Sequence, residues 1–330
     1  MQKVFEVIPQ DELYDKTGIQ FLDINTLYHL YSLKLNRPDV LERAETLLFM
    51  PDLFAYLLTG EKNVEYTIAS TSQLLNAKER NWDFDMIDRL GLKRSLFGKI
   101  TPPGNVIGKL SKDIADELGI AQVDVIAVGS HDTASAVVSA PIEKGEKGCY
   151  VSCGTWSLLG AKIPAPITTP ESMACNFTNE GGVGYIRYLK NIMGLWIVQC
   201  IQKQLGISFA EMVNLARTSH YEQIFNVNDP RFSAPEDMAA EIRAALSPAP
   251  ETDADLIRSV YVSLAHSYGE AIRELERLTG QTWEKLYIAG GGAKNALLNE
   301  LTAQYTGKEV VALPIEATAL GNLKIQREIR

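Results

Sequence analysis

A polar turn between an apolar run and a set of small residues is the strongest chemical signal in this 330-residue chain. The β-branched run 123–128 stops at Gly129, and Ser130-His131-Asp132 then leads into small, helix-compatible residues. This order predicts a strand, a tight turn and a helix, with Asp132 at the helix N-terminus. A carboxylate held there can accept a proton from a substrate hydroxyl, as the base does in phosphoryl transfer. The competing interpretation is that Ser130 or Asp132 only caps the helix, which is the commoner role on position alone.

A second signal is the pair Gly154-Thr155, which has β-prone residues on both sides. The pattern predicts two strands joined by a turn over 149–162. Backbone N–H groups and a hydroxyl in such a turn can hold a phosphate without a lysine. Most Gly-Thr turns only reverse the chain, so it is the pairing with the 130–136 segment at this spacing that favours a phosphate site.

A third signal is the triple glycine Gly290-Gly291-Gly292, between a predicted strand at 286–289 and a predicted helix at 294–305. Glycine lets a ligand approach the backbone closely, and a helix N-terminus favours anions. The sequence is neither a Walker loop nor a dinucleotide fingerprint. Taken alone, it is as often a close-packing turn as a nucleotide site.

The sequence also indicates where the helices that position these residues begin and end. Residues 1–122 are predicted to be mainly helical, with one helix that starts at Pro51 and ends at Gly60, and another from Ser111 to Leu118 that is closed by Gly119. Apolar residues at three- and four-residue spacing predict a long packing helix over 254–279. Pro and Gly residues within 140–148 mark the most natural domain boundary.

A further helix is predicted from about Lys190 to Leu205. On it, Asn191 and Gln199 would lie about 80° apart around the axis and about 12 Å apart along it. One cleft could then reach both side chains. The alternative is that both only decorate a partly exposed helix.

Composition narrows the class of protein. Hydrophobic residues make up 46% and charged residues 22%, as in globular proteins, and the net charge of −9 argues against nucleic-acid or anionic-membrane partners. No apolar run approaches the roughly 18 residues of a membrane span. The four cysteines, at 149, 153, 175 and 200, form no metal-binding pattern, so we expect reduced, mostly buried thiols in a cytoplasm.

The combination of these motifs resembles the FGGY family of carbohydrate kinases, and the resemblance covers nearly the whole chain. Besides 130–136 and 150–158, it rests on segments in the family's order: 17–21, 25–28, 50–52, 58–60, 103–108, 179–182, 190–196, 290–292 and 316–322. Lys190-Asn191-Ile192-Met193-Gly194-Leu195-Trp196, together with Ser130-His131-Asp132-Thr133, is most similar to the members that phosphorylate L-rhamnulose.

The resemblance implies an α/β fold of the two-domain, ribonuclease H-like (actin-like ATPase) type, with a cleft between the domains. Residues 1–140 would be the remainder of the N-terminal, sugar-binding domain, and residues 141–330 the C-terminal, nucleotide-binding domain. Family members begin with an Asp-x-Gly-x-x-Ser-x-Arg type of phosphate-binding signature, which this sequence lacks. We therefore expect a first domain without its initial strands, with an exposed edge or uncovered core, and a chain that also ends early.

The resemblance also implies roles for particular residues in ATP- and Mg²⁺-dependent phosphorylation of L-rhamnulose. Asp132 would be the general base, with His131, Thr133 and Asn191 also contacting the sugar. Thr155, Gln199 and Gly291 would contact ATP. Mg²⁺ would bind mainly through phosphates and water, with no metal ligand assigned to the protein.

Two alternatives stay open. One is a kinase for another ketose or polyol of the same family. The other is a non-catalytic fragment that binds sugar or nucleotide without turnover.

Overall fold

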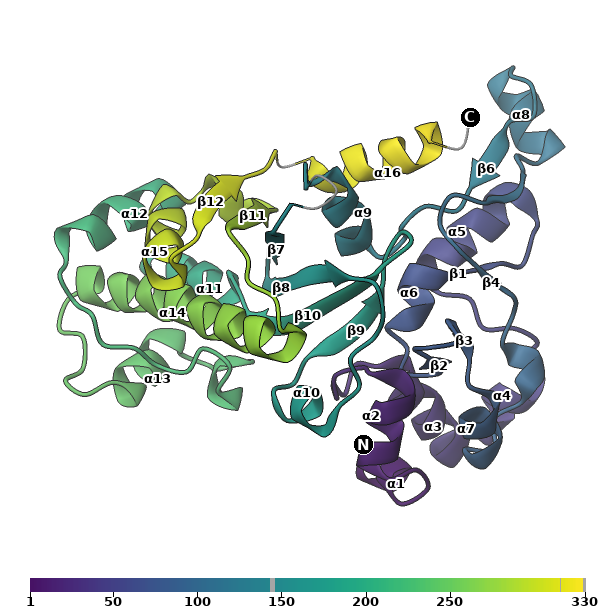
Figure 1. Ribbon diagram of the computed structural model, residues 1–330, viewed down its shortest axis with the longest axis horizontal. Coiled ribbons are helices and arrows are strands. Elements are labelled where there is room, and N and C mark those ends of the chain that lie inside the picture. Colours follow the sequence, from purple (N-terminus) through teal and green to yellow (C-terminus); the bar gives the residue numbers. More distant parts are fainter. Residues whose placement is uncertain (143–145, 315, 329–330) are drawn as a thin grey trace. The chain divides into compact units, whose positions relative to one another are not determined.

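The computed structural model describes residues 1–142, 146–314 and 316–328, and the described chain falls into two compact units. Unit 1 comprises residues 1–139, 162–188 and 318–330, and unit 2 comprises residues 140–161 and 189–317. Part of the predicted boundary at 140–148, residues 143–145, lies outside the described residues. Both units contain helices and strands, in agreement with the predicted α/β class (Figure 1).

Unit 1 is mainly helical in its first 120 residues, as predicted. Its helices are α1 (Gln2–Phe5), α2 (Gln10–Thr17), α3 (Thr26–Asn36), α4 (Pro38–Arg43), α5 (Met50–Thr59), α6 (Tyr66–Ser70), α7 (Phe84–Arg89), η1 (Arg94–Leu96), α8 (Lys112–Leu118), α9 (Asp132–Ser139), α10 (Pro170–Ala174) and nearly all of α16 (Ala317–Arg327). The predicted ends of two helices are confirmed: Gly60 follows α5 and Gly119 follows α8, both in the left-handed conformation that terminates helices.

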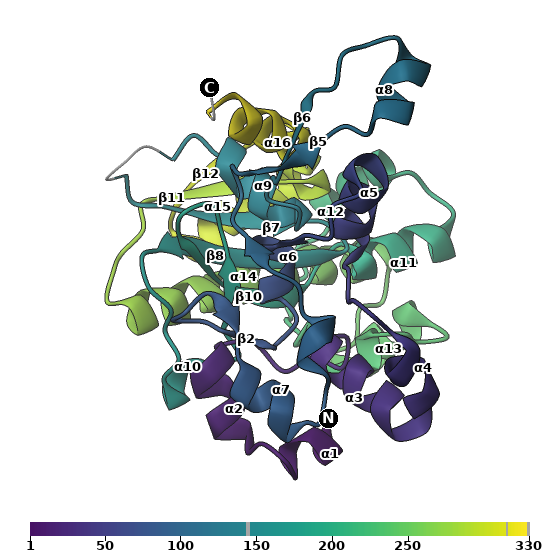
Figure 2. The same ribbon diagram turned by 90° about the vertical axis from the view of Figure 1, so that its right-hand side faces the viewer.

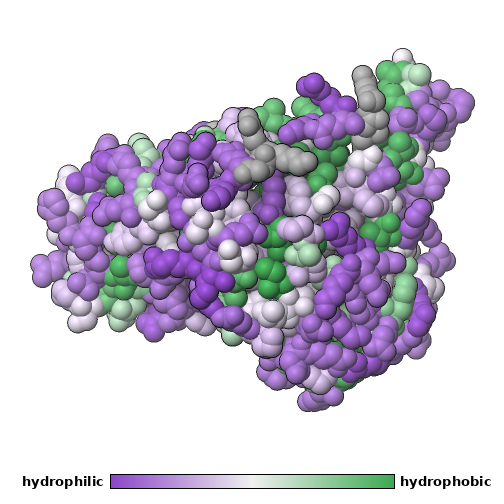
Figure 3. All heavy atoms as spheres, viewed as in Figure 1, coloured by the Kyte–Doolittle hydropathy of each residue, from purple (hydrophilic) through white to green (hydrophobic). Residues whose placement is uncertain are grey.

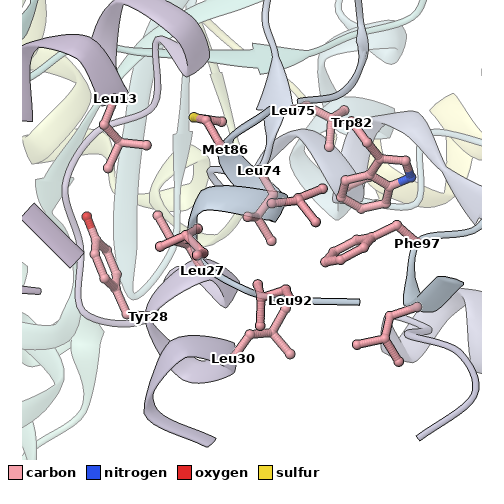
Figure 4. Close-up of a cluster of buried hydrophobic side chains, with 14 of the residues drawn as sticks. Leu13, Leu27, Tyr28, Leu30, Leu74, Leu75, Trp82, Met86, Leu92 and Phe97 are labelled. Atoms are coloured by element: carbon pink, nitrogen blue, oxygen red, sulfur yellow. The ribbon is translucent and has the colours of Figure 1, made fainter. Parts of the chain in front are cut away.

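The strands of unit 1 are short and form small pairs. Strand β1 (Val64–Glu65) runs parallel to β4 (Ile100–Thr101), while β2 (Leu75–Asn76) and β5 (Val106–Lys109) run antiparallel to β3 (Asn81–Trp82) and β6 (Asp124–Ile126), respectively. Strand β9 (Thr178–Gly181) lies beside β10 (Ile186–Met193). A buried cluster from α2, α3, α7 and the β2–β3 hairpin forms the core; Figure 4 shows Leu27, Leu74 and Trp82 among its members.

Helix α5 presents apolar side chains to solvent. Met50, Phe54 and Leu57 keep 64%, 61% and 60% of their surface exposed, at a spacing that puts them on one helix face. In Figure 3, hydrophobic spheres interrupt the polar surface in the region of α5 and α8. Within the described part of unit 1, this face is therefore left uncovered.

Unit 2 is built on a sheet of strands in the order β12 (Glu309–Ala312), β11 (Lys285–Ala289), β7 (Gly148–Cys153), β8 (Trp156–Ile163) and β10. Strand β11 runs parallel to both β7 and β12, with Ile288 opposite Val151 and Ala312, whereas β7 and β8 form the predicted antiparallel pair. The remaining elements of the unit are α11 (Trp196–Leu205), α12 (Phe209–Thr218), η2 (Pro230–Phe232), α13 (Met238–Ala245), α14 (Asp253–Thr279), η3 (Gly291–Lys294) and α15 (Ala296–Thr306).

The long packing helix predicted at 254–279 is confirmed as α14. Thr252 and Asp255 form a reciprocal capping box at its start, and Gly280 ends it at a φ of 65°. Helices α11, α12, α13 and α15 all pack against it, and Figure 1 shows it as the longest helix of unit 2.

The helix predicted from Lys190 to Leu205 is wrong in its first part. Residues up to Met193 belong to strand β10, and helix α11 begins only at Trp196. The strand is buried along most of its length. Its sequence therefore lacks the alternation of apolar and polar residues that would have distinguished a strand from a helix. Gly194 then closes the strand against the turn at 154–157, where a Cβ would lie only 2.7 Å from backbone atoms. Asn191 and Gln199 are thus not on one helix.

Helices α9 and α16 lie side by side in unit 1, as both ribbon views show (Figures 1 and 2). A Cβ added to Gly321 would lie 1.8 Å from the carbonyl oxygen of Ser135, a backbone atom that cannot move aside. The approach is possible because α9 carries small side chains over 134–136.

We expect Gly321→Ala to lower the free energy of unfolding by about 1–3 kcal/mol, because overpacking outweighs the roughly 1 kcal/mol that alanine gains in helix propensity. Urea denaturation measures this change. Leu320→Ala, on the exposed side of the same helix, is the control and should change stability by no more than about 0.5 kcal/mol. A Gly321→Ala variant as stable as the wild type would contradict the close packing of α16 on α9.

Candidate active site

Asp132 is the first residue of helix α9, in the turn that follows β6. Its side chain is 79% exposed, and its Oδ1 accepts hydrogen bonds from the N–H of Thr133 at 2.6 Å and the Thr133 hydroxyl at 3.2 Å. Among the described residues, Oδ2 has no hydrogen-bond partner. The carboxylate is thus held at a helix N-terminus, with one oxygen open to a substrate.

Ser130 accepts no hydrogen bond at its hydroxyl from an N–H of α9 among the described residues. Its hydroxyl and its N–H both donate to Oε2 of Glu65, at 2.5 and 3.1 Å. The next residue, His131, donates its N–H to the Thr67 hydroxyl at 3.2 Å. The capping interpretation therefore fails for Ser130, and this turn is fixed by the start of helix α6.

The His131 ring lies against a buried ion pair. Arg187 is fully buried, and its Nη2 lies 2.9 Å from Oε2 of Glu180 and 2.8 Å from Nδ1 of His131. Burial raises the pKa of Glu180, but the charge of Arg187 and the contacts of His131 outweigh it, so its pKa is lowered. Glu180 is consequently ionised beside the ring.

The Gly154-Thr155 turn and the triple glycine share one edge of the unit 2 sheet. They follow β7 and β11, which are neighbouring parallel strands, so both turns lie at carboxyl ends, where α/β sheets bind ligands. The carbonyl oxygens of Gly154 and Thr155 accept N–H groups of residues 194–196 at 2.8–3.3 Å, which ties this turn to the start of α11. The Thr155 side chain is exposed, and its hydroxyl has no partner among the described residues.

The three glycines differ in what they contact. A Cβ at Gly290 would lie 2.8 Å from the carbonyl oxygen of Cys153, and one at Gly292 would lie 2.2 Å from its Sγ, so these two serve close packing. Gly291 is exposed, and its nearest neighbour would be Leu195 at 3.7 Å. Of the three, Gly291 is therefore the one accessible to a ligand.

Gln199 and Gly291 line one cavity of unit 2, of about 510 Å³. Its apolar wall includes Val198 and Phe209, and its polar groups include Asn214. This size and lining suit a small organic ligand with a flat apolar part and a few hydrogen-bonding groups. Thr155 and Asn191 are not among the residues that line it.

Several residues around these sites escaped sequence analysis. Glu65 and Arg187 lie 65 and 56 residues from their partners in the 130–131 turn. The one signal for Arg187 was a charged residue beside the apolar residues of a β-prone segment. Nothing singled out Phe209 and Asn214, because the cavity is assembled from separate helices.

The structure also bears on metal and thiol chemistry. In the described part of the chain, no three His, Cys, Asp or Glu side chains are grouped so that they could hold a metal ion. None of the four cysteines, all of which are described, forms a disulfide; Cys149 and Cys153 are buried and the other two are partly buried. None of the helices described here has the length and apolar character needed to cross a bilayer.

Comparison with known proteins assigns the family. Residues 1–139 match the N-terminal domain of the FGGY family of carbohydrate kinases, and residues 149–327 match its C-terminal domain. Two rhamnulokinases, from Oceanobacillus iheyensis and Halalkalibacterium halodurans, are 43% and 42% identical to the chain over 333 residues. Each alignment covers 99% of this chain, and 70% and 71% of the respective relative.

Solved structures share the fold at lower sequence identity. A ligand-bound xylulose kinase from Lactobacillus acidophilus superposes with a TM-score of 0.81 at 18% identity, over 99% of this chain and 68% of its own. Glycerol kinase from Plasmodium falciparum with ADP superposes with a TM-score of 0.77 at 16% identity, over the same shares. The matches confirm the α/β fold, and the chain belongs to the FGGY family of carbohydrate kinases.

Proposed function

We propose that this chain phosphorylates L-rhamnulose at its 1-hydroxyl with ATP, in rhamnose catabolism in the cytoplasm. The observation that carries the proposal is the placement of Asp132, an open carboxylate at the start of α9, in a chain 43% identical to a rhamnulokinase. The segments 130–133 and 190–196, which favoured this sugar, are part of that similarity.

In the proposed reaction, Asp132 accepts the proton of the sugar hydroxyl. The hydroxyl oxygen attacks the γ-phosphate of ATP, the bond between the γ-phosphorus and the β-phosphate oxygen breaks, and ADP leaves. The carboxylate needs no covalent step, since positioning and charge stabilisation supply most of the rate in phosphoryl transfer. His131 and Thr133 hold the same end of the sugar, and Asn191 donates to another hydroxyl. Residues 1–140 would form the sugar-binding domain.

The nucleotide would bind through residues of the second domain, 141–330. Gln199 and Gly291 would contact the nucleoside within the 510 Å³ cavity, which supports these two assignments because both residues line it. Thr155 would face the phosphates from the edge of the sheet that also carries the triple glycine.

Mg²⁺ would neutralise phosphate charge when bound with ATP. We expect the ion to be held mainly by phosphate oxygens and water. We therefore assign no protein residue as a metal ligand.

The test is ADP release by the purified chain with L-rhamnulose, D-xylulose, L-fuculose and glycerol, each with ATP and Mg²⁺. We expect kcat/KM for L-rhamnulose to exceed the others by about tenfold or more, the range that a few pocket contacts can supply. A higher value for another sugar would reassign the substrate. Calorimetric binding of sugar or ATP without any ADP release would replace the enzyme by a binding fragment.

A further inference from the structure

The turn that carries Asp132 is held from both sides by buried charged groups that make no contact with its carboxylate. On one side Glu65, 2% exposed, accepts from Ser130. On the other side the Glu180–Arg187 pair contacts the His131 ring. All three partners belong to unit 1, although up to 65 residues separate them along the chain from the turn.

The Glu65 carboxylate both caps helix α6 and accepts hydrogen bonds from Ser130. As the N-cap of α6, it accepts from the Thr67 N–H at 2.8 Å and the Ile68 N–H at 3.3 Å. Its Oε2 also accepts from the hydroxyls of Thr67 and Ser130, each at 2.5 Å. Because three of its five donors are N–H groups that can only donate, the side chain must act as an acceptor.

Capping does not require a glutamate at this position. Asp, Asn, Ser and Thr are the preferred N-caps, and their shorter side chains reach the N2 and N3 amides. Glu65 is one methylene longer, and that extra length is what brings Oε2 to Ser130. Its buried charge would be unfavourable without these donors. The bridge to residue 130 is therefore separable from the cap.

Arg187 acts on the next residue. Its Nη2 lies 2.8 Å from Nδ1 of His131, and the same Nδ1 lies 3.2 Å from Oε2 of Glu180, so both members of the ion pair contact this ring nitrogen. Nε2 is the nitrogen that lies 3.8 Å from Oδ1 of Asp132. The Nε of Arg187 in turn donates to the carbonyl oxygen of Gly181 at 2.8 Å, which fixes the guanidinium.

We infer that Glu65 is a positioning residue, which together with the Glu180–Arg187 pair holds the Ser130-His131 turn so that Asp132 meets the sugar hydroxyl. This inference rests on the proposed function for its kinetic consequence. Its structural consequence, the immobilisation of residues 130–131, does not depend on activity. The two can therefore be tested separately.

The kinetic test compares Glu65→Gln and Glu65→Asp with the wild type. Glu65→Gln places an NH₂ group among the N–H donors, and Glu65→Asp keeps an N-cap for α6 but shortens the reach to Ser130. We expect both to lower kcat for sugar phosphorylation by about 10- to 100-fold, with the KM for ATP within about threefold, since misplacement of a reacting group costs this much. If Glu65 served only as a helix cap, Glu65→Asp would retain wild-type kcat, and that result would overturn the inference.

The structural test is hydrogen exchange of peptides that span residues 128–133. In both variants the amides of Ser130 and His131 should exchange at least about tenfold faster, because an opened hydrogen bond exposes them. Wild-type exchange rates in a folded Glu65→Asp protein would overturn the inference, even if the wild-type chain has no kinase activity. Inactive wild-type protein that nonetheless shows the expected exchange pattern would refute the proposed function alone.

Two further variants complete the test: one controls for a general loss of stability, and the other tests whether Glu65 and Ser130 act together. Asp83→Asn alters another buried N-cap of unit 1, at α7, which makes no hydrogen bond to the turn. It should leave both the exchange of 128–133 and kcat within about twofold of wild type, as expected for distant, independent sites. Ser130→Ala removes the hydroxyl from the bridge and leaves the backbone N–H, so its effect should overlap with that of Glu65→Gln, and the two should not add in the double variant. Full additivity would show that the two residues act separately and would contradict the inference.

Discussion

Asp132→Asn should lower kcat for sugar phosphorylation by about 10²- to 10⁴-fold, the contribution of a well-placed general base. The amide is nearly isosteric with the carboxylate, and its oxygen can keep the hydrogen bonds from Thr133. What it loses is the ability to take the hydroxyl proton. Sugar binding, measured by calorimetry, should therefore stay within a few-fold of wild type, because the contacts to the hydroxyl remain possible.

The matched control is Asp113→Asn, an exposed aspartate in the first turn of α8. It repeats the chemical change at the start of another helix of unit 1, and we expect it to leave kcat unchanged. Near-normal turnover in Asp132→Asn would show that another group accepts the proton. Loss of sugar binding together with turnover would instead indicate that Asp132 holds the substrate.

Local signals predicted the elements that end or begin at special residues. Gly60 and Gly119 both terminate helices in the left-handed conformation, and glycine is the residue best suited to it. The turns at 154–155 and 290–292 were also predicted, because each separates strongly patterned neighbours. These features depend only on the adjacent sequence.

The predictions that failed concern features that depend on residues far away in the sequence. Whether 190–193 is helix or strand depends on partners in β8 and β9, not on its own residues. Glu65 resembles any polar residue before a helix, and its role appears only once Ser130 is brought beside it. The candidate base could thus be predicted from a local motif, whereas the groups that position it could not.

Asp52 is the buried group whose charge should matter most for stability. It is 2% exposed; its Oδ1 accepts the Glu65 N–H at 2.9 Å, and its Oδ2 has no partner among the described residues. Burial, with a smaller contribution from the charge of Glu65, raises its pKa from 3.8 to about 7. The folded state therefore holds this proton more tightly than the unfolded state does.

This shift fixes the sign of the pH effect. The stability contributed by protonated Asp52 is fully present below pH 3.8 and is lost as the pH rises through about 7. The three-unit difference corresponds to about 4 kcal/mol. Asp52→Asn stays neutral at every pH and keeps an oxygen for the Glu65 N–H. It should match the wild type near pH 4 and exceed it by about 4 kcal/mol above pH 8.

Urea denaturation of both proteins between pH 4 and 8.5 measures this difference in the free energy of unfolding. Groups that titrate in the same way in both proteins contribute equally to each and cancel in the difference. Asp113→Asn again serves as the control, and its difference from wild type should stay within about 0.5 kcal/mol across the range, because its side chain is exposed. A difference between Asp52→Asn and wild type that does not change with pH would mean that Asp52 holds its proton equally in both states. Burial of the Asp52 carboxylate would then carry no electrostatic cost, and its raised pKa in the folded state would be wrong.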